Sequence, residues 1–371
     1  MTTNDRASDS RPGDASGIAR LSTGRKILFS ILPLAILLVV AELGLRIAFF
    51  QARSEDPLAL ISAFKHVRNL RYQVDPHGFD DVTDAWEKAF PALYTPVGAD
   101  LLREYMTLYE QDLVRLRDAV REVDARLLVL YVPSADEGWE AIRPTCRTFF
   151  RDVTARNGVD FLDLTERLDA EPAETWTLLP EDYHLSRYGH YLVARELGRY
   201  LDGHVGGFRS GHRFAERPAL LGDLRPDNHR LLEHKIPYRI DTSRQGLRMS
   251  YELAFPKARQ RVLLLGDSFT YGSYVHNHDT FAAILDRQDP DRELVNAGVI
   301  GYTLADELAL FEERARYVEP DVVVLQVLDN DLHGMFFFYR GYFGRRGATV
   351  EPSPTERAFF TELGLGHILE R

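Results

Sequence analysis

Short apolar runs alternate with amphipathic segments in two separate parts of this chain. The runs are rich in Val and Leu and have the pattern of buried strands, whereas the amphipathic segments repeat their apolar positions with the period of a helix. The expected strands are 126–132, 159–162, 261–265, 293–296 and 321–328. The expected helices are 110–123, 145–157, 188–201, 280–287 and 304–317.

Both parts of the chain are needed to build one sheet. Strands that are apolar on both faces are typical of a parallel sheet covered by helices, and their alternation with helices indicates a doubly wound fold. The first part supplies two strands and the second supplies three, with a Gly-rich stretch and a polar segment, 225–249, between them. No internal repeat relates the two parts. We therefore expect a three-layer α/β domain with a mostly parallel, five-stranded sheet.

The N-terminal region has a different pattern. Residues 1–26 are polar and predict a disordered tail, and residues 27–50 are apolar apart from Glu42 and Arg46. That stretch is long enough to cross a hydrocarbon core of roughly 30 Å. The basic residues that precede it are Arg20, Arg25 and Lys26. Positive charge on this side predicts a cytoplasmic tail, a transmembrane anchor and export of everything after residue 50.

This organisation defines three regions. The tail is 1–26 and the anchor is 27–50, and residues 51–371 form a single domain. We expect the domain to be built from 51–205 and 206–371.

Composition narrows the class of protein. The 371 residues are 45% hydrophobic and 27% charged, which is typical of a globular protein with a proper core. The formal net charge of −11, without a Lys/Arg-rich block, argues against a nucleic-acid partner. The single cysteine, Cys146, excludes an internal disulfide and a cysteine-based metal cluster. His276 and His278 lack a convincing third ligand, so we expect neither a metal nor a cofactor.

Ser268 follows the strand 261–265 in the sequence Gly266-Asp267-Ser268-Phe269. A polar residue directly after a buried strand lies at the carboxyl edge of the sheet, where open α/β folds bind ligands. A serine becomes a nucleophile when a base accepts its proton and a third group orients that base. The tripeptide Gly266-Asp267-Ser268, taken alone, is also typical of a turn or a helix cap. Thr270 stands where the G-x-S-x-G elbow of α/β-hydrolases has glycine.

Three segments together resemble the SGNH (GDSL-type) hydrolase family. GDSF around Ser268 is similar to the block that carries the nucleophile, and residues 296–302 (NAGVIGY) are similar to the second block. Residues 328–331 (LDND) resemble the third, although Leu328 replaces the glycine often found there. The resemblance implies that Ser268 is the nucleophile. It also implies an oxyanion hole made by the N–H groups of Ser268 and Gly301 and the amide of Asn330.

The fourth block of the family, which holds the acid and the base, matches upstream of Ser268. Residues 180–190 (PEDYHLSRYGH) contain His184 and precede an expected helix, whereas nothing after Asn330 offers an acid and histidine in this pattern. The order resembles the circularly permuted, SGNH-like domains of alginate O-acetylation proteins. The resemblance covers roughly residues 110–335 in pieces, and it implies an SGNH-like, permuted fold at the inner membrane with the domain in the periplasm.

Two acids could orient His184. Extended backbone places residues i and i+2 on one face, which selects Asp182, whereas a helical turn brings i and i+3 together and selects Glu181. Asp182 is favoured because the family uses an aspartate as the acid, and because the permuted relatives have the D-x-H spacing. Glu181 stays open as the alternative acid.

The resemblance implies acyl transfer through a Ser268–His184–Asp182 triad. The expected activity is that of an O-acetyltransferase or O-acetylesterase on a polysaccharide or other glycan. The expected partners are an acyl-ester or glycan substrate, the membrane through 27–50 and, for transfer, a membrane-bound acyl donor protein. The alternatives are a non-catalytic glycan-binding or assembly protein and a lipase or esterase for small acyl esters.

An aromatic segment, 336–343, has no clear periodicity. It fits a packed insertion, a substrate lid, a glycan-stacking surface or a contact with the membrane interface.

Overall fold

The computed structural model describes residues 37–40, 89–204, 213–232, 236–332, 334–335 and 351–369. The chain divides into two compact units, Met1–Arg68 and Asn69–Arg371. In the first unit the described residues, 37–40, are helical and exposed. The rest of the predicted tail and anchor lies outside the described residues. No helix among the residues that could be searched has the length and apolarity needed to span a membrane, so the predicted anchor is unconfirmed.

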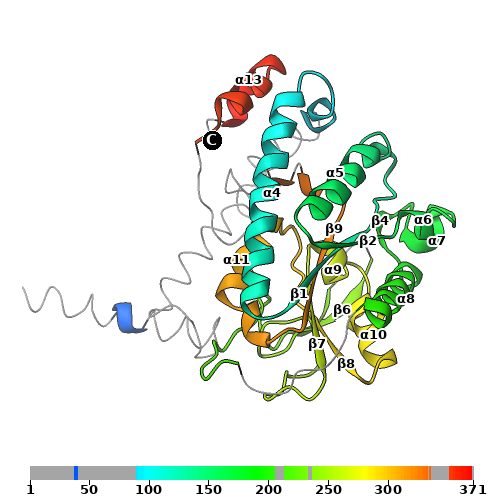
Figure 1. The fold of residues 1–371 in the computed structure, drawn as a ribbon, viewed down its shortest axis with the longest axis vertical. Helices are drawn as coiled ribbons and strands as arrows, with labels where there is room; N and C mark the ends of the chain where they lie inside the picture. The colour runs from blue at the N-terminus through cyan, green and yellow to red at the C-terminus, as the bar shows by residue number, and fades with distance from the viewer. Residues whose placement is uncertain are drawn as a thin grey trace, which may run out of the picture. The chain divides into compact units, whose positions relative to one another are not determined.

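The second unit is built on a five-stranded sheet with the strand order β2-β1-β9-β7-β8. All neighbouring strands in this sheet are parallel (Figure 1). The strands are β1 (Arg126–Tyr131), β2 (Asp160–Asp163), β7 (Gln260–Leu265), β8 (Arg292–Asn296) and β9 (Val322–Val327). β9 lies in the middle and pairs with β1 from the first part of the chain and with β7 from the second. The predicted α/β class and the sheet shared by both parts are therefore confirmed.

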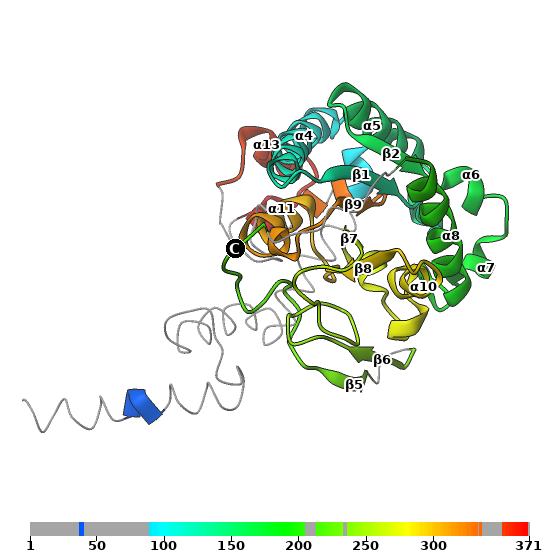
Figure 2. The ribbon, with the colours of Figure 1, turned by 60° about the horizontal axis from the view of Figure 1, so that its bottom comes forward.

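Each face of the sheet has its own core. Alternate residues of a strand point to opposite faces, so Leu127 and Val129 of β1 pack into one apolar cluster, and Leu128 and Leu130 pack into the other. The helices of the first layer are α4 (Ala99–Glu122), α5 (Arg143–Arg156), α11 (Leu304–Glu313) and α13 (Pro354–Glu362). The opposite layer contains α8 (Arg187–His204) and α10 (Phe281–Gln288), as Figure 2 shows.

Two predicted helices differ from the structure by four residues or more at one end. α4 begins at Ala99 instead of residue 110, because Leu101, Leu102 and Tyr105 already form its buried face. The helix expected over 304–317 ends at Glu313, since Arg314 leaves the helical conformation (φ −139°). The Arg314 side chain turns to Asp223, to which it donates a hydrogen bond of 2.8 Å. The segment η3 (Ala315–Val318) then continues as a 3₁₀ turn.

Short elements surround the main sheet. β3 (Thr177–Leu178) pairs with β4 (Asp182–Leu185), and β5 (His229–Leu232) pairs with β6 (Tyr238–Asp241), both antiparallel. The short helical turns are η1 (Glu137–Trp139), α6 (Thr165–Leu168), α7 (Ala173–Trp176), α9 (Ser268–Tyr271), η2 (Asn277–Asp279) and η4 (Gly366–Leu369).

Gly189 allows α8 to approach the segment that carries His184. A Cβ at this position would lie 2.0 Å from the carbonyl oxygen of Trp176, and that oxygen accepts a hydrogen bond from the N–H of Ser186 (3.0 Å). We predict that Gly189→Ala lowers the free energy of unfolding by about 1–3 kcal/mol, because the backbone must shift to relieve the clash. Urea denaturation measures this change.

Gly203, in the same helix, provides the matched control. A Cβ there meets nothing within 4 Å. Gly203→Ala should leave the stability unchanged or raise it by up to about 1 kcal/mol through helix propensity. Equal effects of the two substitutions would contradict the close-packing explanation.

Candidate active site

Ser268 lies at the start of α9, immediately after the buried strand β7. The connection depends on Gly266, whose φ of +150° is unfavourable for other residues and whose Cβ would lie 2.3 Å from Thr270 Oγ1. Asp267 then caps α9, accepting a hydrogen bond of 3.0 Å from the N–H of Phe269. The tight turn and the cap hold Ser268 at the carboxyl edge of the sheet.

His184 reaches Ser268 from the β3–β4 hairpin. His184 Nε2 lies 2.8 Å from Ser268 Oγ, although the two residues are 84 positions apart in the chain. His184 Nδ1 lies 2.5 Å from Asp182 Oδ1, and the same oxygen accepts a hydrogen bond of 3.0 Å from the backbone N–H of His184. A carboxylate at Nδ1 favours a proton on that nitrogen, which leaves Nε2 able to accept the hydroxyl proton of Ser268.

The conformation of β4 determines which acid meets the imidazole. Asp182 and His184 are two apart in an extended strand, so their side chains share one face. Glu181 precedes the strand and is exposed. The structure thus brings Asp182, rather than the alternative Glu181, to His184.

Three aromatic rings surround the imidazole of His184. Tyr183 stacks on it with centroids 4.8 Å apart, Phe269 lies at 5.0 Å, and Tyr274 contacts it edge-on at 5.6 Å. Burial, followed by the charge of Asp182 and a hydrogen bond to it, raises the pKa of Tyr274. The sequence reasoning missed Tyr183 and Tyr274. Tyr183 is visible only as the residue between the acid and the base, and Tyr274 has no local signal.

Residues 296–302, which resemble the second block of the family, run beside the turn that precedes Ser268. The N–H of Ala297 donates to the carbonyl of Leu264, and that of Val299 donates to Gly266, both at 3.0 Å. A Cβ on Gly298 would lie 2.4 Å from the backbone nitrogen of Tyr271. Gly298 is therefore the glycine that permits close approach to α9.

Gly301, the predicted oxyanion donor, lies in an exposed turn with a φ of +76°. Its N–H donates to no residue in the described part of the chain. Its contribution to an oxyanion hole stays a prediction.

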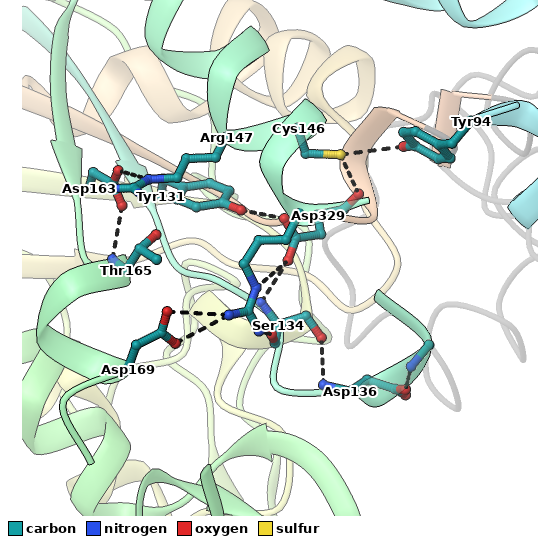
Figure 3. Close-up of polar contacts among 12 residues, drawn as sticks. Tyr94, Tyr131, Ser134, Asp136, Cys146, Arg147, Asp163, Thr165, Asp169 and Asp329 are labelled. Carbon is teal, nitrogen blue, oxygen red and sulfur yellow. Dashed lines mark hydrogen bonds and ion pairs between the residues drawn. The ribbon is translucent and has the colours of Figure 1, made fainter. Parts of the chain in front are cut away.

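In the third motif, two buried acids hold the loop that presents Asn330. Asp329 accepts hydrogen bonds from the hydroxyl of Tyr131 and, at 2.9 Å, from the N–H of Ser134 (Figure 3). Asp331 accepts a hydrogen bond of 2.6 Å from the N–H of Leu328. Asn330 is half-buried, and its amide is bonded to none of the described residues. The two aspartates of the sequence Asp-Asn-Asp therefore anchor the loop on either side of Asn330.

The hydrogen bonds of Asp329 also connect the ends of β1 and β9 to α5. The thiol of Cys146 donates to the carbonyl of Asp329 at 3.4 Å, and the hydroxyl of Tyr94 lies 3.4 Å from the sulfur (Figure 3). Burial raises the pKa of the Cys146 thiol. Cys146 is therefore a packing residue rather than a reactive thiol.

Three buried acids lie behind Ser268. Asp267, Asp331 and Glu307 are each buried, and burial is the main cause that raises the pKa of each carboxyl. The charges of Asp331 and Asp267 also raise the pKa of Glu307. Glu307 Oε1 accepts no hydrogen bond from the described residues. The raised pKa favours the neutral form of Glu307, which lowers the negative charge beside Asp331 and Asp267.

The other histidines near Ser268 have structural contacts. His190 is buried and its Nδ1 accepts a hydrogen bond of 3.2 Å from the N–H of Phe281, while burial lowers its pKa to about 3. His276 Nδ1 accepts from the N–H of Arg239 at 2.9 Å. Within the residues that could be searched, no group of His, Cys, Asp or Glu side chains could hold a metal ion. His333 and the aromatic segment 336–343 lie outside the described residues.

The raised pKa of Glu307 predicts how stability depends on pH. Above pH 4.5 the unfolded chain ionises at this position while the fold retains the proton, so the stabilisation present below pH 4.5 is lost as the pH rises. Glu307→Gln removes this linkage. The free energy of unfolding of the variant, minus that of the wild type, should grow as the pH rises from that point towards the folded-state pKa, by at most about 1.4 kcal/mol per pH unit.

Urea denaturation at several pH values between about 5 and 8 measures this difference in the free energy of unfolding. Glu313→Gln, at an exposed position of the same helix, provides the matched control for loss of a carboxylate. Parallel pH dependences of Glu307→Gln and wild type would contradict a protonated Glu307.

Comparison with known proteins gives matches in structure only. No model of a protein family matches the sequence, and neither does any curated protein. The O-acetyltransferase domain of Pseudomonas putida AlgJ is 14% identical over 70% of this chain and 91% of that domain, with a TM-score of 0.42. Pseudomonas aeruginosa AlgX is 15% identical over 62% of this chain and 59% of its own, with a TM-score of 0.37.

Bacillus cereus PatB1 is 10% identical over 62% of this chain and 90% of its own, with a TM-score of 0.35. Likeness at these identities assigns no activity and no substrate to the chain. The chain is thus similar in structure to these three proteins, the first of which is an O-acetyltransferase domain.

Proposed function

We propose that this chain is a serine acyl-transfer enzyme, an O-acetyltransferase or O-acetylesterase that acts on a polysaccharide or other glycan. The observation that carries the proposal is the continuous contact from Asp182 through His184 to Ser268, with distances of 2.5 and 2.8 Å. Nucleophile, base and orienting acid within hydrogen-bonding reach of one another are the arrangement that activates a serine.

In the proposed reaction, His184 Nε2 takes the hydroxyl proton of Ser268 as Oγ attacks the ester carbonyl carbon. Asp182 holds the imidazole and stabilises the imidazolium that forms. The negative charge that develops on the carbonyl oxygen is stabilised by the N–H groups of Ser268 and Gly301 and by the amide of Asn330. His184 then returns the proton to the leaving alcohol, and the acyl group stays on Ser268.

The second half-reaction decides between the two activities. Water that attacks the acyl-enzyme, with His184 again as the base, gives an esterase. A sugar hydroxyl in the same position gives an O-acyltransferase. The permuted order of the motifs and the anchor predicted over 27–50 favour a glycan at the periplasmic side of the inner membrane, with a membrane-bound protein as the acyl donor.

Paired substitutions of the two neighbouring acids test the triad. Asp182→Asn should lower kcat for acetate release from a chromogenic acetyl ester by up to about 10⁴-fold, because the imidazole loses its correct tautomer. Glu181→Gln is the matched control and should keep kcat within about twofold, since surface substitutions have small effects. Ser268→Ala should abolish the wild-type activity.

Two other results would contradict the proposal or redirect it. An inactive wild-type protein that binds glycan equally well after Ser268→Ala would show a binding protein instead. Loss of activity in Glu181→Gln, with Asp182→Asn active, would show that the wrong acid is assigned. Addition of a polysaccharide acceptor distinguishes transfer, which yields an acetylated glycan, from hydrolysis.

A further inference from the structure

The turn that follows the nucleophile helix has an unusual backbone. α9 ends at Tyr271, Gly272 has a φ of +84°, and Tyr274 has a φ of +64°. Glycine adopts such angles readily, but a bulky aromatic residue rarely does. A residue held in this conformation persists only where the surrounding structure fixes it, and such residues cluster at functional sites.

Arg248 supplies the contacts that fix this turn. Its guanidinium donates to the carbonyl oxygens of Tyr271, of Gly272 at 2.6 Å and of Val275 at 2.7 Å, which bracket Tyr274 on both sides. Its Nε donates to Asn277 Oδ1 at 3.1 Å. The planar fork of arginine can hold several acceptors at fixed angles, which a lysine ammonium cannot reproduce.

Arg248 is itself firmly held. The side chain is buried, with 3% of its surface exposed, and the guanidinium lies 4.3 Å from the centre of the Tyr271 ring. Its backbone N–H donates to the carbonyl of Asn296 at 2.9 Å, at the end of β8. The guanidinium donates only to oxygens of residues 271–277 among the contacts described above, so these bonds hold the backbone of that segment.

The turn presents Tyr274 to the catalytic pair. The Tyr274 ring contacts the His184 imidazole edge-on at 5.6 Å, and its hydroxyl is hydrogen-bonded to Asp182. Arg248, the turn, Tyr274 and the Asp182–His184 pair therefore form one continuous set of contacts.

We propose that Arg248 is a positioning residue of the active site, which holds the turn 271–275 so that Tyr274 fixes the Asp182 carboxylate and the His184 ring in line with Ser268. This inference rests on the proposed Ser268–His184–Asp182 chemistry. Arg248 touches neither the substrate nor the reacting atoms, so its effect on the reaction passes through Tyr274.

The competing explanation is that Arg248 only stabilises the fold, and Arg261 is a matched control for that role. Arg261 is also fully buried and donates to two backbone carbonyls, those of Val318 (2.5 Å) and Ala254 (3.0 Å). Unlike Arg248, it also forms a buried ion pair, with Glu293 at 2.6 Å. It also lies against an aromatic ring, that of Phe255, at 4.9 Å. Arg261 stands at the start of β7, whereas Ser268 follows the end of that strand.

The experiment compares full-length wild type with Arg248→Lys, Tyr274→Phe, the double variant and Arg261→Lys. Steady-state hydrolysis of a chromogenic acetyl ester gives kcat and KM, and thermal denaturation gives Tm. Arg248→Lys and Tyr274→Phe should each lower kcat by between about tenfold and 100-fold with little change in KM, as expected for misplaced catalytic groups. The double variant should be no worse than the poorer single variant, because both act through one contact.

Arg261→Lys should lower Tm as Arg248→Lys does while kcat stays within about twofold of wild type, since it leaves the turn intact. The positioning role is overturned if Arg248→Lys and Arg261→Lys have the same kcat at matched Tm. It is also overturned if the effects of Arg248→Lys and Tyr274→Phe on kcat multiply in the double variant.

A second readout separates this inference from the proposed function. The proton on His184 Nδ1, bonded to Asp182, gives a proton NMR signal that reports the geometry of that bond without turnover. If the wild-type protein hydrolyses no ester, the proposed function fails, yet this signal still tests the inference. A signal displaced by Arg248→Lys and Tyr274→Phe, but not by Arg261→Lys, supports the positioning role, and a signal unchanged in all variants overturns it.

Discussion

The pairing of β9 with β1 on one side and with β7 on the other brings the two parts of this chain into one sheet. Because the strands are parallel, their carboxyl ends meet at the same edge, where a doubly wound sheet binds its ligands. Ser268 follows β7 and Asn330 follows β9 at this edge. His184 arrives separately, on a hairpin held against α8. The contact between His184 and Ser268 joins the two parts, so it depends on the assembly of both.

Several buried polar groups around the site are held by hydrogen bonds. The buried carboxyls of Asp329 and Asp331 are bonded within their loops, and the guanidinium of Arg248 is bonded to backbone carbonyls. An unpaired charge in such a place would be costly, and a bonded one fixes the backbone around it. The hydroxyl of Ser268 and the amide of Asn330 are groups for which we propose contact with the reacting ester.

The sequence predicts the strands of the main sheet well and the site in part. Strands buried on both faces leave apolar runs that can be recognised directly, as at 261–265 and 321–328. β4 has no such run, because its first three residues are half-buried and two of them, Asp182 and His184, are polar. Its extended conformation decides between Asp182 and Glu181. Close approach cannot be inferred from a motif, so Gly298 went unnoticed beside Gly301. Tyr274 acquires its contacts through a turn that Arg248 holds from a distant segment, and no local pattern reveals it.

The central claim is that His184 activates Ser268 as a nucleophile, and covalent labelling tests it most directly. A fluorophosphonate probe reacts with an activated serine, and peptide mass spectrometry locates the modified residue. If His184 activates Ser268, the probe should modify Ser268 rapidly in the wild-type protein. It should not modify Ser268 in His184→Ala, with the fold intact in both proteins. Absence of labelling in the wild type, or equal labelling of Ser268 in His184→Ala, would contradict it.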